Sequence, residues 1–190
     1  IYSSGSEISI HTSDAISDDD GESACSKAIE LLQEGTSTRN IEKIEQAGSD
    51  IYAIIFAEKY ALVKNILLPK LIEIIEASSD DLKPAVMIIL SEVMKIKQLY
   101  PEFLRLGGEK LILSLMDSSS CPIASSALSV FSKNITKENV NVDTIKCILK
   151  FANSKSTFIR LSAAEVLIEM TNTKPVYAQT IPSFLSHFLT

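Results

Sequence analysis

The sequence lacks tryptophan altogether and is poor in glycine, proline and histidine. It holds six glycines, six prolines and two histidines, against many Leu, Ile, Ala, Glu and Lys residues. This balance favours helices over a strand-rich fold with many turns. Neither His11 nor His187 belongs to a nucleophile, metal-ligand or acid/base pattern. We therefore expect an all-α protein that is not an enzyme and needs no cofactor or metal.

Cysteine and long apolar runs are also scarce. Cys25, Cys121 and Cys147 are odd in number and far apart, so they indicate neither a disulfide framework nor a metal site. Reduced thiols are typical of the cytoplasm, which is the location we expect. No segment approaches the roughly 20 apolar residues that span a bilayer, so we expect no membrane insertion.

Basic residues are absent from the first 24 positions, although the net charge of −6 arises there. That segment carries six acidic residues, which leaves 18 acidic against 18 basic residues in the remainder. A neutral body lacks the basic surface of a nucleic-acid-binding protein, so we expect no nucleic-acid partner. The acidic residues of the segment are Glu7, Asp14, Asp18, Asp19, Asp20 and Glu22.

Residues 1–22 are rich in Ser, Asp and Gly, which predicts a disordered acidic arm. The Asp18–Asp20 run lacks the interleaved spacing of a calcium loop. Ser13 and Ser17 precede acidic residues and are candidate phosphorylation sites, with an unmodified linker as the alternative.

Helical periodicity begins at Ser23, which can cap a helix that Gly35 ends. A second helix is expected between Gly35 and Gly48, and a third after Gly48. Prolines mark further helix starts, because a proline in the first turn loses no helical hydrogen bond. These prolines are Pro69, Pro84, Pro101, Pro122, Pro175 and Pro182.

An internal repeat of two apolar helices joined by a polar turn covers the middle of the chain. The first helix repeats at spacings of 40 and 36 residues: Leu71, Ile72 and Ile75; Leu111, Ile112 and Leu115; Cys147, Ile148 and Phe151. The second repeats at 41 and 36: Val86, Ile89 and Leu90; Ala127, Val130 and Phe131; Ala163, Val166 and Leu167. Three copies in register predict a repeat architecture.

A short helix opened by Pro101 ends at Gly107-Gly108, where the next apolar helix begins. This order of elements resembles the armadillo repeat, best over 99–135, with HEAT-type repeats as the alternative. The resemblance implies a right-handed α-α superhelix of about three to four repeats. We assign residues 23–190 to this domain and expect it to continue beyond the fragment.

In armadillo proteins the third helix of each repeat lines a concave groove, and those that bind extended basic peptides carry Trp and Asn there. The corresponding positions of this sequence hold other residues: Ile88 and Glu92, Ser129 and Lys133, Glu165 and Glu169. The absence of these Trp and Asn residues argues against binding of nuclear-import cargo. Glu92, Lys133 and Glu169 predict either a solvated face or a charged stripe that selects a partner.

The C-terminal segment begins another unit without a final helix. Its apolar residues are Val176, Ile181, Phe184, Leu185, Phe188 and Leu189. They either cap the core or leave an apolar edge, with Phe184 and Phe188 facing further repeats, a twin subunit or a partner.

These features together favour a protein–protein interaction scaffold or adaptor that binds through the groove or the C-terminal edge. One alternative is a regulatory cofactor, such as an armadillo-fold Hsp70 nucleotide-exchange factor or the GTPase-binding region of a formin. Another is a solenoid that binds microtubules, a cytoskeletal role that the neutral body and the lack of Trp disfavour.

Overall fold

The computed structural model describes residues 18–116, 118, 120–133 and 142–174. These residues form helices and no strand, which confirms the all-α prediction. In the same ranges no helix combines the length and the apolar character needed to cross a bilayer. The elements are α1 (Asp18–Thr38), α2 (Ile41–Phe56), α3 (Tyr60–Leu62), η1 (Val63–Leu67), α4 (Leu68–Ala77), α5 (Lys83–Val93), η2 (Lys97–Leu99), α6 (Tyr100–Arg105), α7 (Gly108–Met116), α8 (Cys121–Lys133), α9 (Val142–Ala152) and α10 (Thr157–Thr173).

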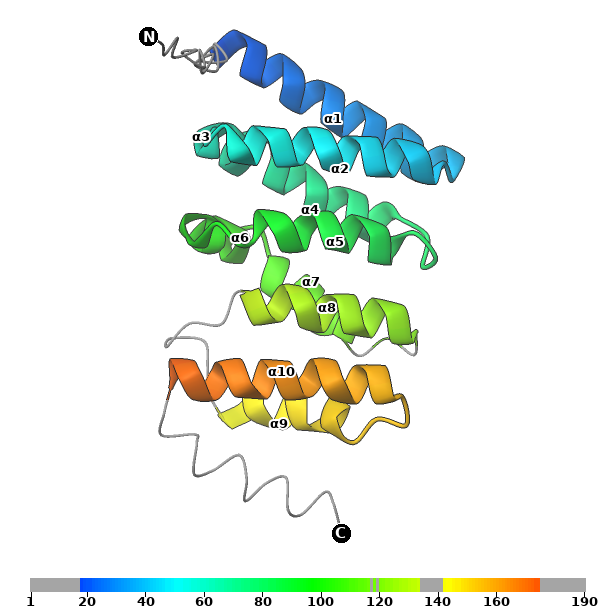
Figure 1. Ribbon diagram of the computed structural model, residues 1–190, viewed down its shortest axis with the longest axis vertical. Helices are drawn as coiled ribbons and strands as arrows, with labels where there is room; N and C mark the ends of the chain where they lie inside the picture. The colour runs from blue at the N-terminus through cyan, green and yellow to red at the C-terminus, as the bar shows by residue number, and fades with distance from the viewer. Residues whose placement is uncertain (1–17, 117, 119, 134–141, 175–190) are drawn as a thin grey trace, which may run out of the picture.

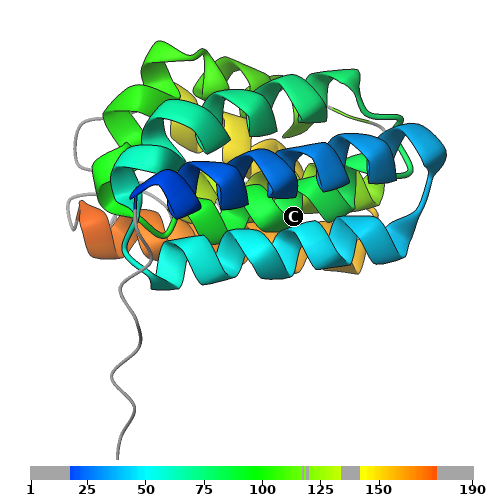
Figure 2. The ribbon, with the colours of Figure 1, turned by 90° about the horizontal axis from the view of Figure 1, so that it is seen from above.

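The helices stack along one axis in two layers (Figure 1). In one layer α2, α5, α8 and α10 lie side by side, each packed on the next. Behind them α4, α7 and α9 pack against α5, α8 and α10 respectively. Figure 2 looks along the stack and shows α2 and α4 on opposite sides. Every helix pair therefore has a neighbour to cover its apolar face.

Most of the repeated apolar positions belong to the core between the two layers. The first helices of the three repeats are α4, α7 and α9, and the second helices are α5, α8 and α10. All nine positions on the second helices are buried: Val86, Ile89, Leu90, Ala127, Val130, Phe131, Ala163, Val166 and Leu167. The expected polar turns join α4 to α5 and α9 to α10. On the first helices Leu111 and Phe151 are only partly buried, so local periodicity predicted the inward-facing residues more accurately for the second helices.

The first two helices differ from the expectation. α1 begins at Asp18, five residues before the start expected at Ser23, and it continues through Gly35. A Cβ at Gly35 would lie 2.8 Å from Ile44 Cγ1, so the glycine permits a close crossing of α1 and α2 instead of ending α1. The chain reverses at Arg39, whose φ is 55°. The prediction that Gly35 ends the first helix is therefore wrong, because the glycine is needed for helix packing inside α1.

Gly48 also lies inside a helix, because α2 runs unbroken from Ile41 to Phe56. The two helices expected on either side of Gly48 are therefore one. The Asn40 side chain caps it by accepting a hydrogen bond from the Lys43 amide at 3.1 Å. Gly48 faces α5, where a Cβ would meet Ile89 Cγ1 at 3.4 Å.

Pro69 lies in the first turn of α4, but that helix follows α3 and the π-helical turn η1 without a break. Proline has no amide hydrogen, and its ring would press on the carbonyl four residues earlier in a regular helix. The wider π turn, with the Leu68 amide donating to the Val63 carbonyl, precedes this position. Pro69 therefore does not begin a separate helix; it lies within a continuous helical segment whose hydrogen-bonding pattern changes just before it.

The corner at Gly107-Gly108 lies where the sequence predicts it, between α6 and α7. Gly107 has a φ of 76°, a conformation that favours glycine. Gly108 is needed for space, because a Cβ there would lie 2.2 Å from Cε2 of the buried Phe103 ring. The two adjacent glycines thus meet two different requirements.

Two glycine substitutions test this account of the packing. Gly108→Ala should lower the free energy of unfolding by about 2 kcal/mol, because the methyl group overlaps the Phe103 ring. Gly48→Ala should be neutral or raise it by up to about 1 kcal/mol, because its Cβ meets only ordinary contacts within a helix. Urea denaturation followed by circular dichroism measures both. Equal effects of the two variants would contradict the structure.

Candidate functional site

The open surface of α2, α5, α8 and α10, which we call the groove face, exposes large apolar side chains. Tyr52 of α2 is 57% exposed, Ile88 of α5 is 62% exposed and Phe158 of α10 is 64% exposed. Leu161 lies one turn after Phe158 and is exposed as well. Single exposed apolar residues are normal, whereas several on one face suggest a binding surface.

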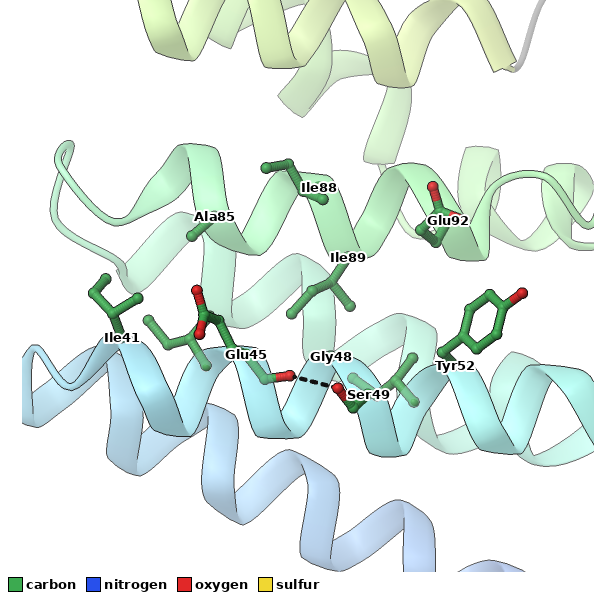
Figure 3. Close-up of a pocket in the computed structure, with 11 residues that line it drawn as sticks. Ile41, Glu45, Gly48, Ser49, Tyr52, Ala85, Ile88, Ile89 and Glu92 are labelled. Atoms are coloured by element: carbon green, nitrogen blue, oxygen red, sulfur yellow. Dashed lines mark hydrogen bonds between the residues drawn. The ribbon is translucent and has the colours of Figure 1, made fainter.

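The larger hollow of this face, the α2–α5 hollow, has a volume of about 670 Å³. Ile41, Glu45 and Tyr52 extend from α2 toward α5, and Ile89 extends from α5 toward α2 (Figure 3). The residues lining it are Ile41, Ile44, Glu45, Gly48, Ser49, Ile51, Tyr52, Ala85, Ile88, Ile89 and Glu92.

Small residues leave this hollow open. Gly48 and Ser49 on α2 and Ala85 on α5 add little side-chain volume between the two helices. The Ser49 hydroxyl donates a hydrogen bond of 3.1 Å to the Glu45 carbonyl of its own helix (Figure 3). Apolar surface therefore makes up most of the walls, and the only charged lining residues, Glu45 and Glu92, are both acidic.

A smaller hollow of about 310 Å³ lies between α5, α8 and α10. Its lining is more polar, with serines from α5 and α8 beside the Phe158 ring. The hydroxyl oxygens of Ser125 and Ser162 are 2.9 Å apart and share a hydrogen bond that joins α8 to α10. This contact satisfies Ser125, which is almost wholly buried.

Ile88 and Glu92 line both hollows, so the two form one groove with α5 at its centre. The Glu92 carboxylate is 2.5 Å from Nζ of Lys95, which lies in the turn just after α5. An exposed pair of this kind contributes little to stability, which leaves both charges available to a partner.

The groove residues expected from the sequence lie on this face to different degrees. Glu92 and Ser129 line hollows. Glu165 and Glu169 are exposed on α10, two and three turns after Phe158. Lys133 ends α8 half-buried, and its carbonyl accepts a hydrogen bond from Lys97 Nζ.

Other expected sites lie outside the described residues. These are the phosphorylation candidates Ser13 and Ser17, the C-terminal edge residues Phe184 and Phe188, and His11 and His187. Their roles stay predictions.

The sequence analysis missed the contribution of α2 to the groove. Ile41, Glu45, Gly48 and Tyr52 recur at helical spacing and share one face of α2. The prediction that a helix ends at Gly48 divided these four residues between two helices. Their shared face becomes apparent from the spacing once Gly48 is placed inside a single helix.

Reactive groups are few in the described part of the chain. No cluster of three His, Cys, Asp or Glu residues suited to a metal ion occurs there. Cys25 is a free thiol buried in α1, whereas the free thiol of Cys121 is exposed at the start of α8. Burial, helped by the nearby Glu22 charge, raises the pKa of the Cys25 thiol.

Alkylation at pH 8 should distinguish these two thiols. Cys25 should react about tenfold or more slowly than Cys121 with iodoacetamide, because it is inaccessible and its raised pKa lowers the thiolate fraction. Mass spectrometry of time-quenched peptides measures both rates, and a urea-unfolded sample is the control. Equal rates in the folded protein would contradict the placement of α1.

Comparisons with known proteins were made by sequence and by structure. No protein-family model, curated protein or solved structure matches the chain significantly.

Proposed function

We propose that this protein is a non-catalytic interaction scaffold that binds a partner protein on the groove face. In this proposal the stacked helix pairs are armadillo-like units of a right-handed superhelix, a shape that presents a long concave surface. Binding buries apolar anchors, and the charges around the groove select the partner.

One observation carries this function: Tyr52, Ile88 and Phe158 expose apolar surface along two hollows that share Ile88. Covering such side chains contributes about 25 cal/mol per Å² of apolar area removed from water. Helix packing already buries the opposite sides of α2, α5 and α10, so these side chains are free to contact a partner.

Affinity capture with the 190-residue chain tests this role. Ile88→Asp should reduce recovery of groove-bound partners about tenfold or more, because it places a charge at the centre of both hollows. Quantitative mass spectrometry compares the recovered proteins with those bound by the unmodified chain.

Leu104→Asp is the matched control, since Leu104 is an exposed apolar residue of α6, outside the groove face. It should retain the partners that Ile88→Asp loses. Circular dichroism must show that both variants are folded, as expected for exposed positions. Partners retained by Ile88→Asp would place binding elsewhere and refute the groove as the binding surface.

A further inference from the structure

The α2–α5 hollow has the shape of a trough that runs along two neighbouring helices. Its lining extends on α2 from Ile41 to Tyr52, which lie eleven residues apart. At 1.5 Å per residue this is about 16 Å, or three turns of helix. The small residues Gly48, Ser49 and Ala85 are among the residues that line it, and small side chains let another backbone approach closely.

The trough offers few free hydrogen-bonding groups, which favours an occupant whose backbone amides and carbonyls are already hydrogen-bonded. The walls are helices, whose backbone amides and carbonyls are satisfied internally. The Ser49 hydroxyl already donates to the Glu45 carbonyl. An extended segment would lose water from its own amides and carbonyls and find few replacements. A helical segment brings those groups already paired.

The charges of the trough favour a basic occupant. Glu45 and Glu92 are its only charged lining residues, and Glu92 forms an ion pair with Lys95, which lies just outside the lining. The Glu45 carboxylate forms no ion pair with any residue in the described part of the chain. Two copies of this surface facing each other would bring like charges together, so a symmetric dimer through the trough is disfavoured.

From this combination we infer that the α2–α5 hollow binds an amphipathic helix of a partner protein. The helix presents aliphatic or aromatic residues at spacings of three and four over about three turns. Lys or Arg residues beside this apolar stripe pair with Glu45 and Glu92. This inference rests on the proposed interaction function and names the chemistry of its partner.

Selection from a displayed library of random 16-residue peptides tests the inference without assuming a sequence. The 190-residue chain is the bait, and selected peptides are synthesised and titrated by fluorescence anisotropy. The winners should combine an apolar helical stripe with Lys or Arg, and their binding should weaken as salt is added. Ile88→Asp should weaken binding about tenfold or more.

A charge exchange then locates the basic residues of the peptide. Glu45→Lys should weaken a selected peptide about tenfold, and replacing one of the peptide's Lys residues by Glu should restore part of that loss. Glu76→Lys is the matched control, because Glu76 is exposed on α4 in the other layer, and it should change affinity less than about twofold.

Each contrary outcome overturns the inference. These outcomes are a library without binders, winners that are acidic or lack helical spacing, and affinities that ignore Glu45→Lys. If natural partners still depend on Ile88 in such a case, the interaction function stands and only the basic helix is refuted. If neither natural partners nor peptides depend on Ile88, both proposals fail.

Discussion

The structure depends on the stacking of helix pairs that cannot bury their apolar surfaces alone. α5 shows this constraint most clearly, because it packs on α2, α4 and α8 at once. Val86, Met87 and Leu90 are buried among these neighbours. A helix that is apolar on nearly every side is stable in water only when neighbours cover it. Its place in the middle of the stack thus determines where the groove face lies, since only one side remains open.

Much of this packing could be predicted from the sequence, because it follows from local periodicity. The triplets of the second helices recur in register, and all their members are buried. The corner at Gly107-Gly108 could be predicted too, because adjacent glycines after a short helix are a local signal. These features depend on spacing along one segment, and spacing is what a single sequence contains.

The interpretation of the sequence failed at two glycines that lie within helices. Gly35 is inside α1, where its small size lets Ile44 of α2 approach closely, and Gly48 is inside α2, where a Cβ would meet Ile89 only at ordinary contact distance. No local pattern distinguishes a glycine that ends a helix from one that lets two helices cross. The same error hid the groove contribution of α2, because the hollow requires α2 to continue past Gly48.

Ile88 lies at the centre of the proposed binding surface and is exposed there. Its neighbours Met87 and Ile89 are buried, whereas Ile88 points away from the core at 62% exposure. The stack gains little from an isoleucine there, because no helix in the described part of the chain covers that side of α5. If this surface bound nothing, a polar residue at position 88 would be equally compatible with the fold and would reduce the risk of aggregation. An apolar side chain at the junction of two hollows, with a carboxylate one turn away at Glu92, is consistent with the proposed binding of an apolar and basic partner.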